Sequence, residues 1–551
     1  MTIAATLRVA VVAPPSLKAA LMERLRQSAL AEPIAETETA AANALVYMPD
    51  GPRPGRSADA FGTSLEHATE LTRRGIERVI VVSSAAVYGA TPYTPGFVNE
   101  TWEAPPTHPN AVVEWWRAFE RQATAAFAGA TLTVLRPAAV LDGESYFSRL
   151  FRGAAAVTLT GYDPSIQLLA VDDLLAAIAC ALTKSAGGIF NVAPAGVIPL
   201  RTALRMASAL RIPVPRLWQR AIRLALAPAG LAWAGDQVEF IRYSSTISGD
   251  RIDRELGFLP ARTSAEALEA FLNRATEARE PRDEPAREFD RFGQDKAYIA
   301  AYGATLFTFL RKFYWRIETD GLEHVPATGR AVIAGPHRGF MPFDGVMLLH
   351  LVARGRGRYI RFLIHPSLVK FPFLFNFMTK LGGIPACREN ADWTLQQDEL
   401  AGVFPEGIHG AFTPYRDAYR LGKFGRDEFV RIALRNRAPI VPFAIVGSAE
   451  IFPILAKIRW AWWERWTEWP YFPITPTFPL APIPLPSKWH VRFLEPIRVN
   501  DRYPPGAAED PRVVREISGL VRQRIQAALD EMVARRRWIF FGSIFGHGSH
   551  G

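Results

Sequence analysis

Residues 331–345 have the sequence AVIAGPHRGFMPFDG, and this stretch decides how the C-terminal half of the chain is interpreted. The apolar run 331–334 is typical of a short buried strand, which a Gly-Pro pair ends. His337 therefore follows a strand end, and Asp344 lies seven positions further on. We expect the glycine and proline between them to form a loop that folds Asp344 back onto the imidazole. A continuous helix would place the two side chains two turns apart.

Three later segments also combine an apolar run with turn residues. They are GGIPACREN at 382–390, VFPEG at 403–407 and APIVPFAIVG at 438–447. Short apolar runs bounded by glycine and proline are typical of buried strands in α/β domains. The four segments together predict a C-terminal α/β domain with polar residues at its strand ends.

The N-terminal half shows the same alternation of buried strands and helices. Strands are expected at 7–13, 44–48, 79–83 and 132–135, with helices over 17–30 and 64–74. This alternation indicates a Rossmann-like parallel sheet with right-handed crossovers.

A charged stretch separates the two halves. Residues 276–293 (TEAREPRDEPAREFDRFG) contain two prolines and no apolar stripe, which is typical of a linker. We therefore expect a Rossmann-like domain over 1–275, a charged linker over 276–297 and a second domain over 298–551.

The basic surplus of the chain lies in its C-terminal half. Residues 301–551 contain 33 basic and 22 acidic residues, whereas residues 1–275 contain 26 and 25. Such a surplus favours anionic partners such as phospholipid headgroups, and no recognisable nucleic-acid-binding module accompanies it. The two cysteines, Cys180 and Cys387, are too few for a disulfide framework or a cysteine-rich metal site. We expect no bound metal, and the sequence does not predict the oligomeric state.

Aromatic residues beside cations favour contact with a membrane surface. No run of about 18 uncharged apolar residues occurs, so no spanning helix is predicted. The segment 451–486 is dense in Trp, Phe and Pro, and the tail 535–541 (RRRWIFF) also combines aromatic residues with cations. Such rings suit the bilayer interface, although 451–486 equally suits an aromatic loop packed over a core. The N-terminus has no secretory signal pattern, and we expect a cytoplasmic protein bound peripherally to the inner membrane face.

Five short motifs of the N-terminal half follow the order found in one enzyme family. They are SSAAVYG at 83–89, NET at 99–101, LRP at 135–137, VDDL at 171–174 and FNVA at 190–193. Together they resemble the extended short-chain dehydrogenase/reductase family, the NAD-dependent epimerases and dehydratases, over residues 1–275. The resemblance implies a Rossmann-like fold with Ser84 at the position of a catalytic hydroxyl.

The catalytic residues of that family are missing from this sequence. Such enzymes need a tyrosine as acid/base and a lysine four residues later, whereas this chain has Val112 and Trp116 at these positions, and no lysine between Lys18 and Lys184. The loop 13–19 (APPSLKA) has no glycine, and its two prolines remove two amide donors from a phosphate site. We therefore expect no redox catalysis, no required cofactor and no binding of NAD or NADP.

The four segments of the C-terminal half resemble, in order, the four blocks of the glycerolipid acyltransferases, the lysophosphatidic acid acyltransferase superfamily. The resemblance covers residues 300–535, and the stretch 471–479 is similar to a bacterial subgroup. The common first block has Asn-His and then an Asp after four further residues. Here Pro336 precedes His337, and six residues separate His337 from Asp344. This form is similar to the mono- and diacylglycerol acyltransferase-like branch, which leaves the acceptor open.

The residue types fit acyl transfer to an alcohol. A neutral histidine can accept the proton of an attacking hydroxyl at cytosolic pH, and a carboxylate on its other ring nitrogen fixes the tautomer. We therefore expect His337 to act as general base and Asp344 to orient it. The resemblance places four residues beside the polar head of the acceptor: Phe404, Pro405, Glu406 and Gly407. It also implies that Arg388 binds a phosphate.

The leading hypothesis is a membrane-associated O-acyltransferase that moves a fatty acyl group from acyl-CoA or acyl-ACP to a lysophospholipid or glycerolipid hydroxyl. The acceptor could instead be a neutral alcohol such as diacylglycerol. Two other hypotheses stay open: an epimerase or reductase acting through the N-terminal domain, and a non-catalytic membrane scaffold. The missing lysine and glycines argue against the first, and the intact pair of His337 and Asp344 argues against the second.

Overall fold

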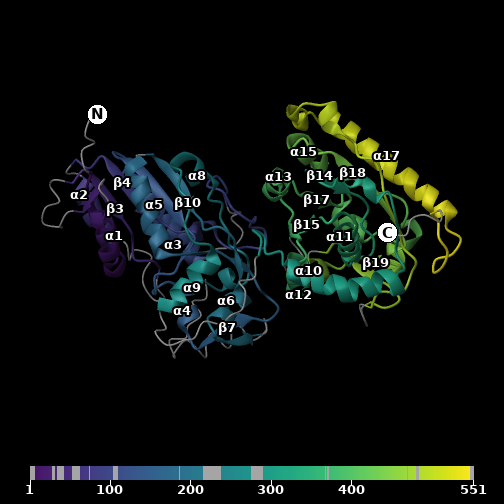
Figure 1. Cartoon of the computed structure of the whole chain (residues 1–551), viewed down its shortest axis with the longest axis horizontal. Helices are drawn as coiled ribbons and strands as arrows, with labels where there is room; N and C mark the ends of the chain where they lie inside the picture. The colour runs from purple at the N-terminus through teal and green to yellow at the C-terminus, as the bar shows by residue number, and fades with distance from the viewer. Residues whose placement is uncertain are drawn as a thin grey trace. The chain divides into compact units, whose positions relative to one another are not determined.

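The computed structural model of the chain divides into two compact units, Met1–Gly293 and Gln294–Gly551 (Figure 1). The structure describes residues 7–27, 31–33, 42–52, 62–72, 75–103, 110–184, 186–214, 237–274, 289–365, 368, 371–425, 427–467, 469–478 and 483–545. Residues 276–288 of the predicted linker lie outside the described residues.

The N-terminal unit is built on six parallel strands in the order β10-β5-β4-β3-β1-β2. The strands are β1 (Leu7–Val12), β2 (Ala31–Pro33), β3 (Ala44–Tyr47), β4 (Arg78–Val82), β5 (Thr131–Pro137) and β10 (Gly188–Val192). The strand order reverses between β1 and β3, which is the switch point of a doubly wound sheet. The predicted Rossmann-like parallel sheet is confirmed.

Helices cover both faces of this sheet (Figure 1). They are α1 (Pro15–Gln27), α2 (Gly62–Thr72), α3 (Ala111–Ala126) and α5 (Val171–Lys184). α1 and α5 pack on one face through residues such as Leu21 and Leu174. α2 and α3 pack on the other through Leu65 and Phe119. Because the strands are buried on both faces, their sequences are continuous apolar runs.

Smaller elements complete the N-terminal unit. They are β6 (Ala139–Val140), α4 (Tyr146–Arg152), β7 (Ala155–Leu159), β8 (Ser165–Ile166), β9 (Leu168–Leu169), β11 (Ile198–Pro199), α6 (Leu200–Met206), β12 (Leu210–Val214), α8 (Asp250–Leu256) and α9 (Ser264–Arg274). β7 pairs with β12, β6 with β9 and β8 with β11. With the strand ends of the sheet, some of these elements enclose a cavity.

The C-terminal unit has a seven-stranded mixed sheet in the order β13-β21-β18-β14-β17-β15-β16. The strands are β13 (Glu318–Asp320), β14 (Ala331–Ala334), β15 (Ile360–Ile364), β16 (Ile384–Pro385), β17 (Leu400–Val403), β18 (Ile440–Val446) and β21 (His490–Phe493). The five strands from β18 to β16 are parallel, and β21 is antiparallel to β18. The predicted α/β class of this domain is confirmed.

Helices also cover both faces of the second sheet. They are α10 (Lys296–Tyr302), α11 (Phe343–Arg356), α12 (Pro372–Lys380), α13 (Arg388–Gln396), α14 (Gly407–Ala411), α15 (Glu428–Arg435), α16 (Ala461–Thr467) and α17 (Pro511–Arg535). α10 and α11 contribute Ile299 and Met347 to one core. α13, α15 and α17 contribute Leu395, Val430 and Val521 to the core of the other face. Within the described parts of the chain, no helix is long and apolar enough to cross a membrane.

The aromatic segment 451–486 divides between core and surface. Trp463 and Trp469 are buried in the core that includes α11. Trp460 and Trp462 are more than half exposed. Both interpretations of the segment therefore hold in part: some of its aromatic residues pack in the core, and others are exposed at the surface.

Candidate active site

The loop after β14 brings His337 and Asp344 together. β14 ends at Ala334 and α11 begins at Phe343, so Asp344 lies in the first turn of the helix. Nδ1 of His337 is 2.8 Å from Oδ2 of Asp344. Between them Gly339 has a φ of +68°, a left-handed conformation that glycine adopts without steric cost. A loop that turns back, and not a continuous helix, therefore connects the pair.

Asp344 is held in one orientation by backbone amides. Its Oδ2 also accepts a hydrogen bond from the amide of Arg338 (3.0 Å), and its Oδ1 accepts one from the amide of Gly345 (2.8 Å). A carboxylate oxygen only accepts, so Nδ1 of His337 donates in this contact and Nε2 presents its lone pair. The aspartate side chain is fully buried, whereas the imidazole is 15% exposed. This arrangement can serve as a general base with its orienting carboxylate.

Phe404 packs against the imidazole. The two ring centroids are 4.8 Å apart at 31°, and Phe404 also stacks on Phe362 at 5.2 Å and 8°. Phe404 directly follows β17, which pairs with β14 in the sheet. The neighbouring strand ends therefore bring together the histidine and an aromatic ring that limits its rotation.

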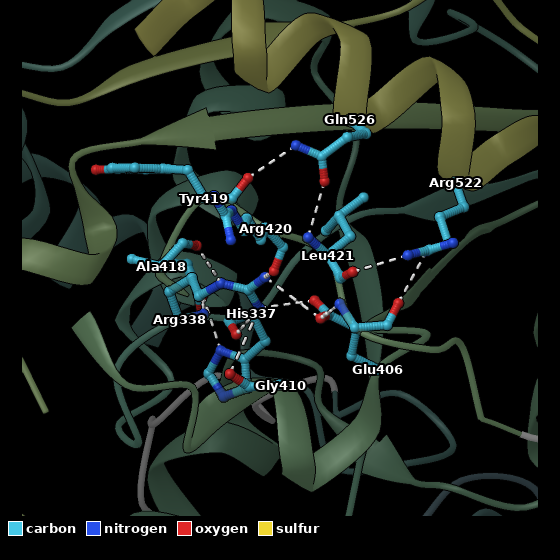
Figure 2. A network of polar contacts seen from close by, with 12 residues as sticks. His337, Arg338, Glu406, Gly410, Ala418, Tyr419, Arg420, Leu421, Arg522 and Gln526 are labelled. Atoms are coloured by element: carbon cyan, nitrogen blue, oxygen red, sulfur yellow. Dashed lines mark hydrogen bonds and ion pairs between the residues drawn. The ribbon is translucent and has the colours of Figure 1, made fainter. Parts of the chain in front are cut away.

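Arg338 and Glu406 form a buried ion pair next to the histidine (Figure 2). Nη1 of Arg338 lies 2.6 Å from Oε2 of Glu406, and their side chains are 2% and 3% exposed. The guanidinium also donates to four backbone carbonyls, those of His337, Gly410, Ala418 and Arg420. The pair thereby fixes the His337 loop to the turn after β17.

The ion pair is connected to the C-terminal helix α17 through the segment 418–422. The amide of Gly422 donates to Oε1 of Glu406 (2.7 Å). Figure 2 shows Gln526 and Arg522 of α17 bonded to backbone groups of the same segment. The position of the histidine loop therefore depends on contacts with a helix more than 170 residues later in the sequence.

A second buried cluster lies on the same segment. The hydroxyl of Tyr419 donates to Oε1 of Glu450 (2.5 Å), which also forms an ion pair with Arg536. Burial, and then the charge of Glu450, raise the pKa of Tyr419 well above its ordinary value, so the phenol stays protonated. Arg338 bonds the carbonyls of Ala418 and Arg420, on either side of Tyr419, so this cluster links Arg536 of the tail 535–541 to the His337 loop.

The Pro405-Glu406-Gly407 turn is fixed by backbone hydrogen bonds. The amide of Gly407 donates to the carbonyl of Phe404 (2.8 Å), and the amide of Gly425 donates to that of Pro405 (2.9 Å). Both carboxylate oxygens of Glu406 already have partners. The Glu406 side chain is 3% exposed, and the predicted role of this turn at the head of the acyl acceptor stays a prediction.

Arg388 lies at the same edge of the sheet but away from His337. It begins α13 just after β16, and β17 and β15 lie between β16 and β14. At about 4.8 Å per strand, this corresponds to a separation on the order of 14 Å. Its side chain is 56% exposed, with Nε 3.6 Å from Oδ2 of Asp392. Its predicted role in phosphate binding stays a prediction.

In the N-terminal unit, the three positions that correspond to catalytic residues of the dehydrogenase/reductase family line one cavity. Ser84, Val112 and Trp116 border a cavity of about 640 Å³ at the carboxyl ends of β1, β3, β4 and β5. The hydroxyl of Ser84 accepts a hydrogen bond from the amide of Ala86 (3.1 Å) and so caps a 3₁₀ turn. Neither Val112 nor Trp116 can transfer a proton, so these positions contain no acid/base pair. Among the residues that the structure describes, no group of His, Cys, Asp and Glu could hold a metal ion.

Sequence reasoning missed Arg338 as a member of the site. Its partner Glu406 is 68 positions away, and only the parallel pairing of β14 with β17 brings the following turns together. One signal was available, because an arginine and a lone glutamate both follow apolar runs. In adjacent parallel strands such residues meet at one sheet edge.

Comparisons with known proteins bear on the C-terminal half. The model of the Acyltransferase family matches residues 316–446, which include His337, Asp344 and the turn 404–407. An uncharacterized protein of Mycobacterium leprae (strain TN) is 40% identical over 262 residues, covering 46% of this chain and 70% of that protein. Another, from Mycobacterium tuberculosis (strain ATCC 25618 / H37Rv), is 37% identical over 257 residues, with 46% and 72% covered. The C-terminal half of the chain therefore contains a domain of the Acyltransferase family.

Two further comparisons cover other shares of the chain. Phytyl ester synthase 2 of Arabidopsis thaliana is 28% identical over 141 residues, covering 24% of this chain and 20% of that protein. The structure of a UDP-glucose 4-epimerase from Thermus thermophilus matches with a TM-score of 0.38 and 16% identity, covering 50% of this chain and all of that one. The predicted acyltransferase class of the C-terminal domain is confirmed by the family model.

Proposed function

We propose that the C-terminal unit is an O-acyltransferase in which His337 is the general base and Asp344 orients it. The observation that supports this proposal is the 2.8 Å contact between Nδ1 and the buried carboxylate, inside the segment matched by the family model. A histidine held in this way can accept a proton through Nε2. The imidazole also retains some exposure through which a substrate hydroxyl can reach it.

The proposed reaction is an addition and an elimination at an acyl thioester. Nε2 of His337 takes the hydroxyl proton while the hydroxyl oxygen bonds to the thioester carbonyl carbon, giving a tetrahedral oxyanion. The oxyanion collapses to an ester, the carbon–sulfur bond breaks, and the imidazolium returns the proton to the thiolate. Asp344 stabilises the imidazolium between the two steps. Acyl-CoA or acyl-ACP is the proposed donor, and no other cofactor is needed.

No covalent acyl-enzyme is part of the proposal. The substrate hydroxyl takes the place of the serine in a hydrolase triad. The cysteine of the C-terminal unit, Cys387, is a poor nucleophile because burial raises the pKa of its thiol to about 12.

We propose a lysophospholipid or related glycerolipid as the acceptor, with a neutral alcohol as a second candidate. The basic surplus of the C-terminal half and the exposed Arg388 support an acceptor with a phosphate. A neutral alcohol is supported by the state of Arg338, the arginine next to the base. Its guanidinium is buried and already bonded to Glu406 and to backbone carbonyls, so it is not available to bind a phosphate. The similarity to a phytyl ester synthase also favours a neutral acceptor.

The acceptor is tested with a matched pair, lysophosphatidate and monoacylglycerol of the same chain length, each with acyl-CoA on liposomes. If Arg388 binds the phosphate, Arg388→Gln should lower kcat/KM for lysophosphatidate by about tenfold or more and leave monoacylglycerol unaffected. Equal activity on both acceptors, unchanged by the substitution, would reject a phosphate-specific site. Inertness with every donor and acceptor would favour the scaffold hypothesis, and measurable reduction of NAD or NADP would favour the redox hypothesis.

We also propose that the C-terminal unit binds an anionic membrane through one aromatic surface. Arg316 donates to the carbonyl of Phe540 (2.7 Å), and the Tyr314 hydroxyl donates to that of Pro484 (2.7 Å), so three segments lie side by side. Their exposed apolar side chains are Phe309, Phe313, Ile483, Trp538, Ile539, Phe540 and Phe541. Exposed rings next to arginines suit the bilayer interface.

Substitution of two rings of this aromatic surface should weaken membrane binding. We expect Phe540→Ser/Phe541→Ser to lower the partition onto phosphatidylglycerol-containing liposomes by about tenfold or more, because two large apolar side chains no longer insert. Flotation of the full chain measures the partition. Leu259→Ser, at a similarly exposed leucine of the N-terminal unit, is the matched control and should float as the native protein does. Equal flotation of all three proteins would remove the support for this surface.

A further inference from the structure

The cavity of the N-terminal unit lies where α/β sheets bind ligands. Four of its walls are segments at the carboxyl ends of parallel strands: 14–17 after β1, 48–52 after β3, 82–86 at the end of β4 and 137–140 at the end of β5. The first two flank the switch in strand order, the usual ligand position in a doubly wound sheet. Its volume of about 640 Å³ is in the range of small-molecule sites.

The residues present do not fit a dinucleotide. The turn after β1 has no glycine, and Pro14 and Pro15 provide no amide hydrogen to a pyrophosphate where α1 begins. The described charged residues that line the cavity are three acids and one base: Asp50, Asp142, Glu144 and Arg149. This balance disfavours phosphates.

The cavity instead offers apolar side chains, neutral polar groups and one buried hydroxyl without a described partner. Leu17, Met48, Trp116 and Phe240 are among its lining residues. Tyr146 also lines it, and its hydroxyl oxygen is buried without a hydrogen-bond partner among the described residues. Buried hydroxyls are normally bonded, so a partner for this group is expected from beyond the described residues. Burial raises the pKa of Tyr146, which keeps the phenol protonated as a donor.

We propose that this cavity binds a neutral, largely apolar molecule that contains a hydroxyl or carbonyl oxygen, to which the hydroxyl of Tyr146 forms a hydrogen bond. Apolar side chains accommodate the hydrocarbon part, and the acidic balance of the described lining residues disfavours anions. The cavity and His337 belong to different units of the chain, and the proposal does not depend on the function of the C-terminal unit.

The test is calorimetric binding to the full chain with three probes: 1-decanol, decanoate and NAD. Decanol should bind, decanoate should bind at least about tenfold more weakly because its carboxylate meets an acidic site, and NAD should not bind. Tyr146→Phe should weaken decanol binding by about three- to tenfold, the effect of one neutral hydrogen bond.

A cavity-filling variant distinguishes this site from any apolar site in the C-terminal unit. Val112→Trp, at a position that lines the cavity, should abolish this decanol binding, and thermal unfolding verifies that both variants are folded. If decanol binding is unchanged in both folded variants, decanol binds at another site, and this result would overturn the proposal. Tight binding of NAD, or decanoate binding as strong as that of decanol, would overturn it as well.

Discussion

Replacement of Asp344 by asparagine should lower kcat for acyl transfer by about 100- to 10,000-fold. Asparagine has nearly the same shape, and its Oδ1 can still accept the hydrogen bond from the amide of Gly345. In this orientation its NH₂ group faces Nδ1 of His337 and the amide of Arg338, whereas in the flipped orientation it faces the amide of Gly345. In the first orientation the imidazole must move its proton to Nε2, which then cannot remove a proton from a hydroxyl. In the second orientation no negative charge stabilises the imidazolium that forms.

The measurement is kcat with a saturating acyl-CoA donor, together with thermal unfolding of both proteins. Asp501→Asn, at an exposed aspartate, is the control for a general effect of losing one charge and should retain native activity. An Asp344→Asn variant that keeps more than a tenth of native kcat would show that the carboxylate does not set the tautomer of a catalytic base.

Removal of the guanidinium of Arg338 should destabilise the C-terminal unit by about 3–5 kcal/mol. The variant Arg338→Met leaves the carboxylate of Glu406 buried, with the Gly422 amide as its remaining hydrogen-bond partner among the described residues. An unpaired buried charge is costly because neither water nor a cation stabilises it in the low-dielectric interior. Chemical denaturation measures the change in the free energy of unfolding.

Two further variants test whether the effect arises from the buried charge. Arg338→Met/Glu406→Gln removes both charges and should regain more than half of the lost stability. Arg416→Met removes one partner of an exposed pair with Asp417, whose side chains are 85% and 41% exposed, and should change stability by less than about 0.5–1 kcal/mol. If Arg338→Met were as mild as Arg416→Met, the buried pair would not hold the loop.

The elements with long apolar runs could be predicted closely from the sequence. The strand expected at 7–13 is β1, Leu7–Val12, and the strand expected at 44–48 is β3, Ala44–Tyr47. The pairing of β13 with β21 could not be predicted, because Glu318 and His490 are 172 positions apart and both strands are short. Periodicity indicates that a strand exists, but pairing depends on the whole packed domain.

The candidate site was predictable where its contacts are local. His337 and Asp344 are separated by one loop, and glycine and proline in that loop indicated that it would turn back. The ion pair of Arg338 and Glu406 depends on the pairing of two neighbouring strands. The cluster of Tyr419, Glu450 and Arg536 depends on three separate segments. No spacing rule in the sequence relates such residues before the fold is known.

The missing redox residues of the N-terminal domain were evident from the sequence, but its cavity was not. Absence of a lysine is a property of the sequence itself. A cavity forms from segments after four different strands and from α4, and its shape depends on how these side chains pack.

The most direct test of the account is acyl transfer from radiolabelled acyl-CoA to a lipid hydroxyl by the native protein and by His337→Ala, measured side by side on liposomes. His409→Ala, at an exposed histidine of the same unit, serves as the matched control. The account predicts ester formation by the native protein and by the control, and a rate at least about 100-fold lower for His337→Ala in a folded protein. Ester formation at the native rate in His337→Ala would contradict the assignment of His337 as the base.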